Sequence, residues 1–173
     1  MDRLFERARW SGEQPLWKNF ENSVFPCLGI NFGPTACSIR HRDTRNLPYG
    51  WCAITALGNF NSKTGGHLVL HDLELILEFP ANSTILMPSA TLAHANTIVE
   101  EGSSRASFTQ FSAGDLFRFV DCGFKTLKTL RNEDPTEYEE VRKKQRQNWE
   151  NGIQLFSLIA EIKNDYHNLY ETR

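Results

Sequence analysis

The residues best suited to chemistry lie at positions 40–46, which read Arg-His-Arg-Asp-Thr-Arg-Asn, and further along the chain at His94 and Arg105. A His and a carboxylate two residues apart on an extended strand point to the same face, because side chains alternate along a strand. His41 and Asp43 have this spacing, and His94 can supply a second imidazole. Two imidazoles and one carboxylate on one face of an octahedral ion form the facial triad of non-haem Fe(II) centres. The sequence therefore predicts a metal site made of His41, Asp43 and His94.

A possible anion-binding pair follows at Arg105 and Ser107, which would share one face of a strand. A guanidinium can grip a carboxylate through two parallel hydrogen bonds, and a hydroxyl can assist. If this face is buried, the polar side chains need a polar partner, which an anionic ligand would supply. The alternative is an ordinary sheet-surface Arg paired with a Glu. We favour the anion site, because Arg-x-Ser follows the proposed ligands within a series of short strands.

The same motifs also occur in other classes of protein and site. His-Arg-Asp also occurs in the catalytic loop of protein kinases, but the sequence has neither their Gly-rich loop nor Asp-Phe-Gly. His67 and His71, four residues apart on one expected strand, compete with His94 for the ligand role. A hydrogen-bonded His at a strand end is the simpler interpretation of each. His67 follows Gly65-Gly66 at an expected barrel mouth, so contact with substrate is a second possibility for it.

Composition is that of an ordinary folded protein, with 40% hydrophobic and 23% charged residues in a chain of 173. This length fits a single domain. A net charge of −2 gives no overall attraction to nucleic acid, so any DNA contact depends on a local basic patch. Charges interrupt every apolar run, and the first residues lack the apolar core of a signal peptide. The four cysteines form no Cys-x-x-Cys motif, which favours reduced thiols and an intracellular location.

The expected elements are mostly short strands. Each candidate strand is rich in Val, Ile, Leu, Thr or Phe and is bounded by turn residues, a pattern typical of a sandwich or barrel. The candidates are 27–32, 36–41, 51–57, 67–71, 73–79, 83–87, 91–99 and 104–111. Helices are expected within an N-terminal segment, 1–25, and again at 135–170. The second of these C-terminal helices, 153–169, carries an apolar stripe suited to packing on a sheet.

Taken together, these motifs resemble the Fe(II)/2-oxoglutarate dioxygenases, and among them the TET/JBP-like group that is abundant in fungi. The resemblance covers residues 27–124 and includes His41-Arg42-Asp43, Gly65-Gly66-His67, His94-Ala95-Asn96 and Arg105-Ala106-Ser107. It implies a mainly β chain with flanking helices, whose core over 26–124 is a double-stranded β-helix of jelly-roll or cupin-like form. It also implies Fe(II) and 2-oxoglutarate as cofactors. The activity implied is oxidation of a methylated DNA base, foremost 5-methylcytosine to 5-hydroxymethylcytosine and further products.

The resemblance also assigns roles to single residues. Iron ligation falls on His41, Asp43 and His94, and binding of 2-oxoglutarate falls on Arg105. Ser107 and Asn31 would assist Arg105. A flipped base would be contacted by Asn46 and Phe111, with His67 at the rim and Arg42 and Arg45 on the flanking phosphates. Ala113 stands where animal TET enzymes carry a base-contacting His, and their Cys-rich region has no counterpart here.

Two further classes remain open. One is a 2-oxoglutarate hydroxylase that acts on a protein side chain or a small molecule, since −2 is a poor charge for a DNA binder. The other is a cupin-like binding module without catalysis. If methylated DNA is the partner, a nuclear location follows. No membrane association is expected.

Overall fold

A computed structural model of the chain describes residues 20–162, 164 and 166–167. The chain divides into two compact units at the junction of Lys125 and Thr126. Most of the N-terminal segment expected to be helical, 1–25, lies outside the described residues, and its described part at 20–25 forms turns and bends. Among the described residues, no helix is both long enough and apolar enough to cross a bilayer.

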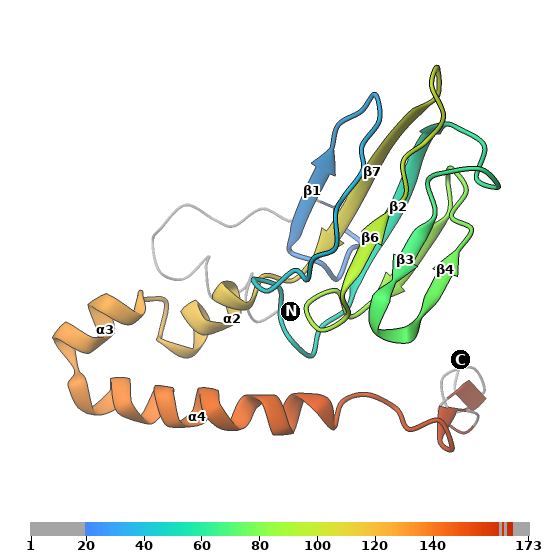
Figure 1. Cartoon of the computed structure of the whole chain (residues 1–173). Helices are drawn as coiled ribbons and strands as arrows, with labels where there is room; N and C mark the ends of the chain where they lie inside the picture. Colours follow the sequence, from blue (N-terminus) through green and yellow to red (C-terminus); the bar gives the residue numbers. More distant parts are fainter. Residues whose placement is uncertain (1–19, 163, 165, 168–173) are drawn as a thin grey trace. The chain divides into compact units, whose positions relative to one another are not determined.

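The first unit is built from two antiparallel sheets (Figure 1). The larger sheet has the strand order β1-β7-β2-β5, and the smaller has the order β4-β3-β6. Most of these strands are short runs rich in Leu, Ile, Val, Thr or Phe, as expected, whereas β6 is His94-Ala95-Asn96. Their bounds are β1 Cys27–Asn31, β2 Cys52–Asn59, β3 Leu68–Leu70, β4 Leu75–Leu77, β5 Thr84–Met87, β6 His94–Asn96 and β7 Ser104–Phe111.

Within residues 34–47, the stretch 38–41 pairs with β6 of the smaller sheet without forming a regular strand. The prediction of a strand at 36–41 was wrong for most of its length. The reason is that the segment changes partners: Ala36 N–H donates to the Arg105 carbonyl of β7, whereas His41 forms a bridge with His94 of β6. With this bridge the smaller sheet reads 38–41, β6, β3, β4. Apart from the consecutive pair β3 and β4, the chain passes from one four-membered layer to the other at each step, which is the jelly-roll arrangement of a double-stranded β-helix.

The core of the first unit lies beneath β2 and β3, where Cys52, Ala56, Leu68 and Leu70 are buried. Phe60 packs against this core and also covers Gly66. Gly66 has a φ of +71°, and a Cβ there would lie 2.6 Å from the Phe60 ring. Only glycine suits this position, because it combines left-handed backbone with no space for a side chain. The Gly65-Gly66 turn thus fixes where β3 begins.

Helices follow the last strand. Helix α2, Gly114–Asp121, occupies part of the region expected to be β core and was not predicted. In the second unit, α3 spans Leu127–Glu133 and α4 spans Pro135–Ile153, with Thr126 and Asp134 as N-caps. The predicted second helix at 153–169 is wrong over residues 154–160, which form turns and bends. The side chains of Leu155 and Ile159 are exposed there, so no buried apolar face supports a helix in that stretch.

Candidate active site

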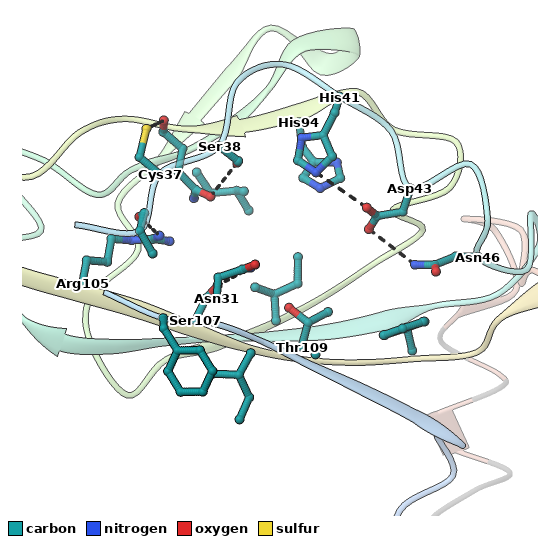
Figure 2. Close-up of a pocket in the computed structure, with 18 residues that line it drawn as sticks. Asn31, Cys37, Ser38, His41, Asp43, Asn46, His94, Arg105, Ser107 and Thr109 are labelled. Atoms are coloured by element: carbon teal, nitrogen blue, oxygen red, sulfur yellow. Dashed lines mark hydrogen bonds and ion pairs between the residues drawn. The ribbon is translucent and has the colours of Figure 1, made fainter. Parts of the chain in front are cut away.

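Three side chains that could hold a metal meet at one wall of a cavity. His41, Asp43 and His94 are the one such group among the described residues, and their ligand atoms all lie within 4.8 Å of one another. His41 Nε2 lies 3.6 Å from Asp43 Oδ1, and the two imidazole centres are 4.3 Å apart. The backbone bridge between His41 and His94 holds the rings side by side. The sequence placed these residues together, and the structure does the same (Figure 2).

Both imidazoles are oriented by their own backbone. Nδ1 of His41 lies 2.8 Å from the Ile39 carbonyl, and Nδ1 of His94 lies 2.9 Å from the Leu92 carbonyl. A carbonyl only accepts hydrogen bonds, so Nδ1 is the donor in each ring, and Nε2 is the nitrogen left to face a metal. This is the arrangement in which metal-binding histidines are held by an outer hydrogen bond. The donor set of two imidazoles and one carboxylate therefore fits an octahedral Fe(II) ion bound on one face.

Arg105 is a buried cation with an incomplete set of partners. It is 2% exposed, and its Nη1 donates to the Ala36 carbonyl over 2.7 Å. Its Nε and Nη2 are buried without a hydrogen-bond partner among the described residues. Burial lowers the pKa of the Arg105 guanidinium from its ordinary value, yet arginine stays protonated in proteins. Two unpaired donors on a buried cation are costly unless an anion completes them.

Ser107 and Asn31 lie beside Arg105 in the register of the larger sheet. Asn31 of β1 pairs with Ser107 of β7, and Asn31 Nδ2 donates to Ser107 Oγ over 2.9 Å. Because Ser107 Oγ accepts this bond, its own proton is available for an acceptor in the cavity. Ser107 is 5% exposed. The structure thus brings together the three residues expected to bind the co-substrate, opposite the His-Asp-His wall (Figure 2).

The cavity that joins these two groups has a volume of about 590 Å³, a size typical of small-molecule sites. Asn46 and Phe111, the expected base-contacting residues, also line it. Asn46 Nδ2 donates to Ser89 Oγ over 3.1 Å and to Asp43 Oδ2 over 3.4 Å. Asn46 therefore also steadies a metal-ligand candidate, which leaves its amide oxygen for a donor on a bound molecule.

Three of the expected substrate residues lie elsewhere. His67 is absent from the cavity lining, and its Nδ1 lies 3.1 Å from Thr97 Oγ1. Arg42 is also outside the lining, because its Nη2 is 2.9 Å from both carboxylate oxygens of Asp72. Arg45 is exposed next to the cavity-lining Asn46.

Sequence reasoning missed several residues of the site. Cys37, Ser38 and Asn96 line the cavity, and Ser38 Oγ donates to Asn96 Oδ1 over 3.1 Å. Ser89, 1% exposed, accepts from Asp43 N–H over 3.0 Å through its carbonyl. Cys37 and Ser38 belong to no motif with a fixed spacing, whereas Asn96 stands in the motif His94-Ala95-Asn96 without an assigned role. Asn96 follows His94 by two residues, so strand alternation alone could have placed both side chains on one face.

Comparisons with known proteins give weak likenesses. No family model matches the sequence, and no curated protein matches it. The structure of NgTET1 in complex with 5mC DNA is 13% identical with a TM-score of 0.48, over 65% of this chain and 42% of that chain. A 2OG complex of the viral collagen prolyl hydroxylase vCPH from Paramecium Bursaria Chlorella virus-1 is 15% identical with a TM-score of 0.36, over 50% of this chain and 61% of that chain. The chain therefore spans less than two thirds of either neighbour.

The class of this protein follows from its own fold and cavity and does not depend on these weak likenesses. The chain is a jelly-roll protein with a His-Asp-His group that could hold a metal, and this group shares one cavity with a buried, partly unpaired arginine.

Proposed function

We propose that this chain is an Fe(II)- and 2-oxoglutarate-dependent dioxygenase. The observation that carries the proposal is that Arg105, which has two unpaired buried donors, lines the same cavity as His41, Asp43 and His94. When bound, Fe(II) and 2-oxoglutarate would supply the oxidant, with O₂ and the co-substrate consumed to give a hydroxylated product, succinate and CO₂. A binding module without catalysis would need neither three converging ligands nor a cationic pocket beside them.

The chain's own residues have distinct tasks in this proposal. His41, Asp43 and His94 would hold the metal, and Fe(II) bound by such a triad supports oxygenase chemistry. Arg105 grips the distal carboxylate of the co-substrate, and the Ser107 hydroxyl donates to the same group. Phe60 lies against Arg105 on the side of the core, with the guanidinium carbon 6.0 Å from the ring centre. Burial strengthens the charge pairing of Arg105 with a carboxylate.

The metal assignment is tested by the absorption band that forms when Fe(II) and 2-oxoglutarate bind together without oxygen. We expect His94→Ala to abolish this band, because it removes a ligand. His67→Ala is the matched control and should keep the band, since His67 lies beside Thr97 and outside the cavity lining. Loss of the band in His67→Ala with retention in His94→Ala would reverse the assignment.

For the substrate, we propose a methylated base flipped out of DNA, with 5-methylcytosine as the first candidate; a nuclear location then follows. Phe111 lines the cavity and offers a ring on which a base can stack, a contact worth roughly 1–3 kcal/mol in single-strand binders. Asn46 offers a free amide oxygen, which suits the exocyclic amine of cytosine. Arg45 is exposed nearby and could contact a flanking phosphate.

A second substrate class is favoured by one observation. Ile30 and Phe32 belong to the cavity lining and are 44% and 80% exposed. An apolar rim of this kind also suits a polypeptide or an apolar small molecule. A protein side-chain or small-molecule hydroxylase is therefore the alternative.

The substrate is tested by mass spectrometry of nucleosides after incubation with methylated DNA, Fe(II) and 2-oxoglutarate. We expect oxidised 5-methylcytosine from the wild type. Phe111→Leu should lose base oxidation while it retains uncoupled decarboxylation, because it keeps apolar packing and removes the stacking face. Phe108→Leu is the control, since Phe108 packs against Phe20 and is absent from the cavity lining. A wild type that decarboxylates 2-oxoglutarate but leaves every methylated DNA unchanged would favour the hydroxylase.

A further inference from the structure

A carboxylate outside the cavity joins the two segments that carry the metal-ligand candidates. Asp72 lies in the short 3₁₀ helix η1, His71–Leu73, after β3. Its Oδ2 accepts from the Ala93 N–H over 2.7 Å, and both of its oxygens lie 2.9 Å from Arg42 Nη2. Ala93 directly precedes His94, and Arg42 lies between His41 and Asp43. Asp72 therefore contacts the immediate neighbours of all three candidates.

Arg42 extends this connection. Its Nε donates to the Thr91 carbonyl over 2.8 Å, so the guanidinium bonds both to Asp72 and to the segment that leads into His94. The hydrogen bond from Ala93, with the charge of Arg42 in support, lowers the pKa of the Asp72 carboxyl. The carboxylate is therefore ionised at neutral pH and accepts at every contact.

We propose that Asp72 is a positioning residue for the metal site, acting through Arg42 and Ala93 on His41, Asp43 and His94. This inference rests on the proposed function, since it assumes that these three residues bind a metal. The Asp72 side chain is 31% exposed and that of Arg42 is 43% exposed. An ion pair this exposed adds little to folding stability. Its effect is instead to fix the segment 41–43 relative to the segment 91–94. The relative position of these segments sets the geometry of the three metal-ligand candidates.

Outer contacts of this kind typically change metal affinity by about ten- to a hundredfold when they are removed. Asp72→Ala removes all three hydrogen bonds and should weaken binding by about that much. Asp72→Asn keeps one oxygen for the Ala93 N–H but loses the charge that attracts Arg42, so its affinity should fall between those of Asp72→Ala and the wild type. The double variant Arg42→Ala/Asp72→Ala should lose less than the sum of the two single losses, because the residues act through one another.

The test is a titration of the full chain with Co(II) alone, without 2-oxoglutarate, followed through the visible bands of the bound ion. These bands report ligand geometry as well as occupancy. Asp115→Ala is the matched control: Asp115 pairs with Arg118 on α2 over 2.8 Å and is 70% exposed. The control should bind Co(II) with wild-type affinity and wild-type bands, whereas Asp72→Ala and Asp72→Asn should show weaker binding and altered bands.

Thermal unfolding of the metal-free variants separates positioning from general damage. We expect both Asp72 variants to unfold cooperatively near the temperature of Asp115→Ala. If Asp72→Ala does not fold, the milder Asp72→Asn provides the comparison. Wild-type Co(II) affinity and bands in a folded Asp72 variant would overturn the positioning role and leave the metal site standing. A wild type that binds no Co(II) would overturn the metal site and the positioning role together.

Discussion

Arg105 is the residue on which the proposed chemistry most depends, and its environment makes a sharp prediction. A buried guanidinium with unpaired Nε and Nη2 should bind an anion strongly. A hydrogen bond to a charged group is worth roughly 1.5–3 kcal/mol, so Arg105→Ala should weaken 2-oxoglutarate binding by about ten- to a hundredfold. Arg105→Lys keeps the charge but lacks the planar guanidinium, so its affinity for 2-oxoglutarate should lie between those of the wild type and Arg105→Ala.

The measurement is the dissociation constant of 2-oxoglutarate with Co(II) in the metal site, which prevents turnover. Arg118→Ala, an exposed arginine on α2 that is 46% exposed and paired with Asp115, serves as control. Equal affinity in the wild type, Arg105→Lys and Arg105→Ala would show that Arg105 holds no carboxylate.

Single residues were the most predictable part of this site. His41 and Asp43 were recognised from their alternation, and Arg105 and Ser107 from theirs, because side-chain direction along an extended chain depends only on local geometry. The partners of Arg42 could not be predicted in the same way. From the sequence, Arg42 was expected to contact a flanking phosphate, and only the folded chain brings Asp72 to it. Contacts between residues far apart in sequence leave no local periodic signal.

At the scale of elements, the turn at Gly65-Gly66 contacts Arg105 indirectly, through the ring of Phe60. A Cβ at Gly66 would meet the Phe60 ring at 2.6 Å, and the same ring lies 6.0 Å from the guanidinium carbon. Gly66→Ala should destabilise the fold by about 1–3 kcal/mol, since it adds a steric clash to left-handed backbone. Displacement of Phe60 should also weaken 2-oxoglutarate binding.

Gly102→Ala separates the cost of left-handed backbone from the cost of the clash with Phe60. Gly102 has a φ of +80°, yet a Cβ there would meet nothing within 4 Å. This variant should show the backbone cost alone, of about 1 kcal/mol, with unchanged 2-oxoglutarate affinity. Chemical denaturation measures the first quantity, and ligand titration measures the second. Equal stability and equal affinity in the two variants would mean that the Phe60 ring does not help to position Arg105.

Elements were predicted less completely than residues. The strands at 104–111 and 83–87 were expected nearly where β7 and β5 lie, because each is a short apolar run between turn residues. The segment 34–47 was misjudged, since its changing partners follow from the two sheets and not from its own sequence. Helix α2 was missed because it is short and opens with Gly114 and Asp115, which favour turns as readily as helix.

For the whole molecule, charge decides how DNA could be bound. The net charge of −2 excludes general attraction, so the proposed substrate must be held by a few local contacts. Each phosphate contact adds about −0.9 to the slope of log binding constant against log salt concentration. Arg45→Ala should make this slope less negative by about 1. Arg42→Ala should leave it unchanged, because the Arg42 guanidinium is engaged by Asp72.

The control for this comparison is Lys63→Ala, in the connection between β2 and β3, since Lys63 is exposed and outside the cavity lining. Binding of methylated DNA is measured at several salt concentrations with Co(II) in the metal site. A steep slope that Arg45→Ala leaves intact would place the phosphate contacts on another surface.

The order of strands in the larger sheet also has a consequence for the timing of folding. The first strand, β1, pairs with the last, β7. In the same way His41 pairs with His94 of β6, which comes more than fifty residues later in the chain. Contacts that join distant parts of a chain form slowly, because a long loop must close first. During synthesis, the sheets cannot close until Phe111 has left the ribosome. We therefore expect the proposed metal site to form only after β7 has paired with β1, so that a chain that ends before Phe111 should bind no metal.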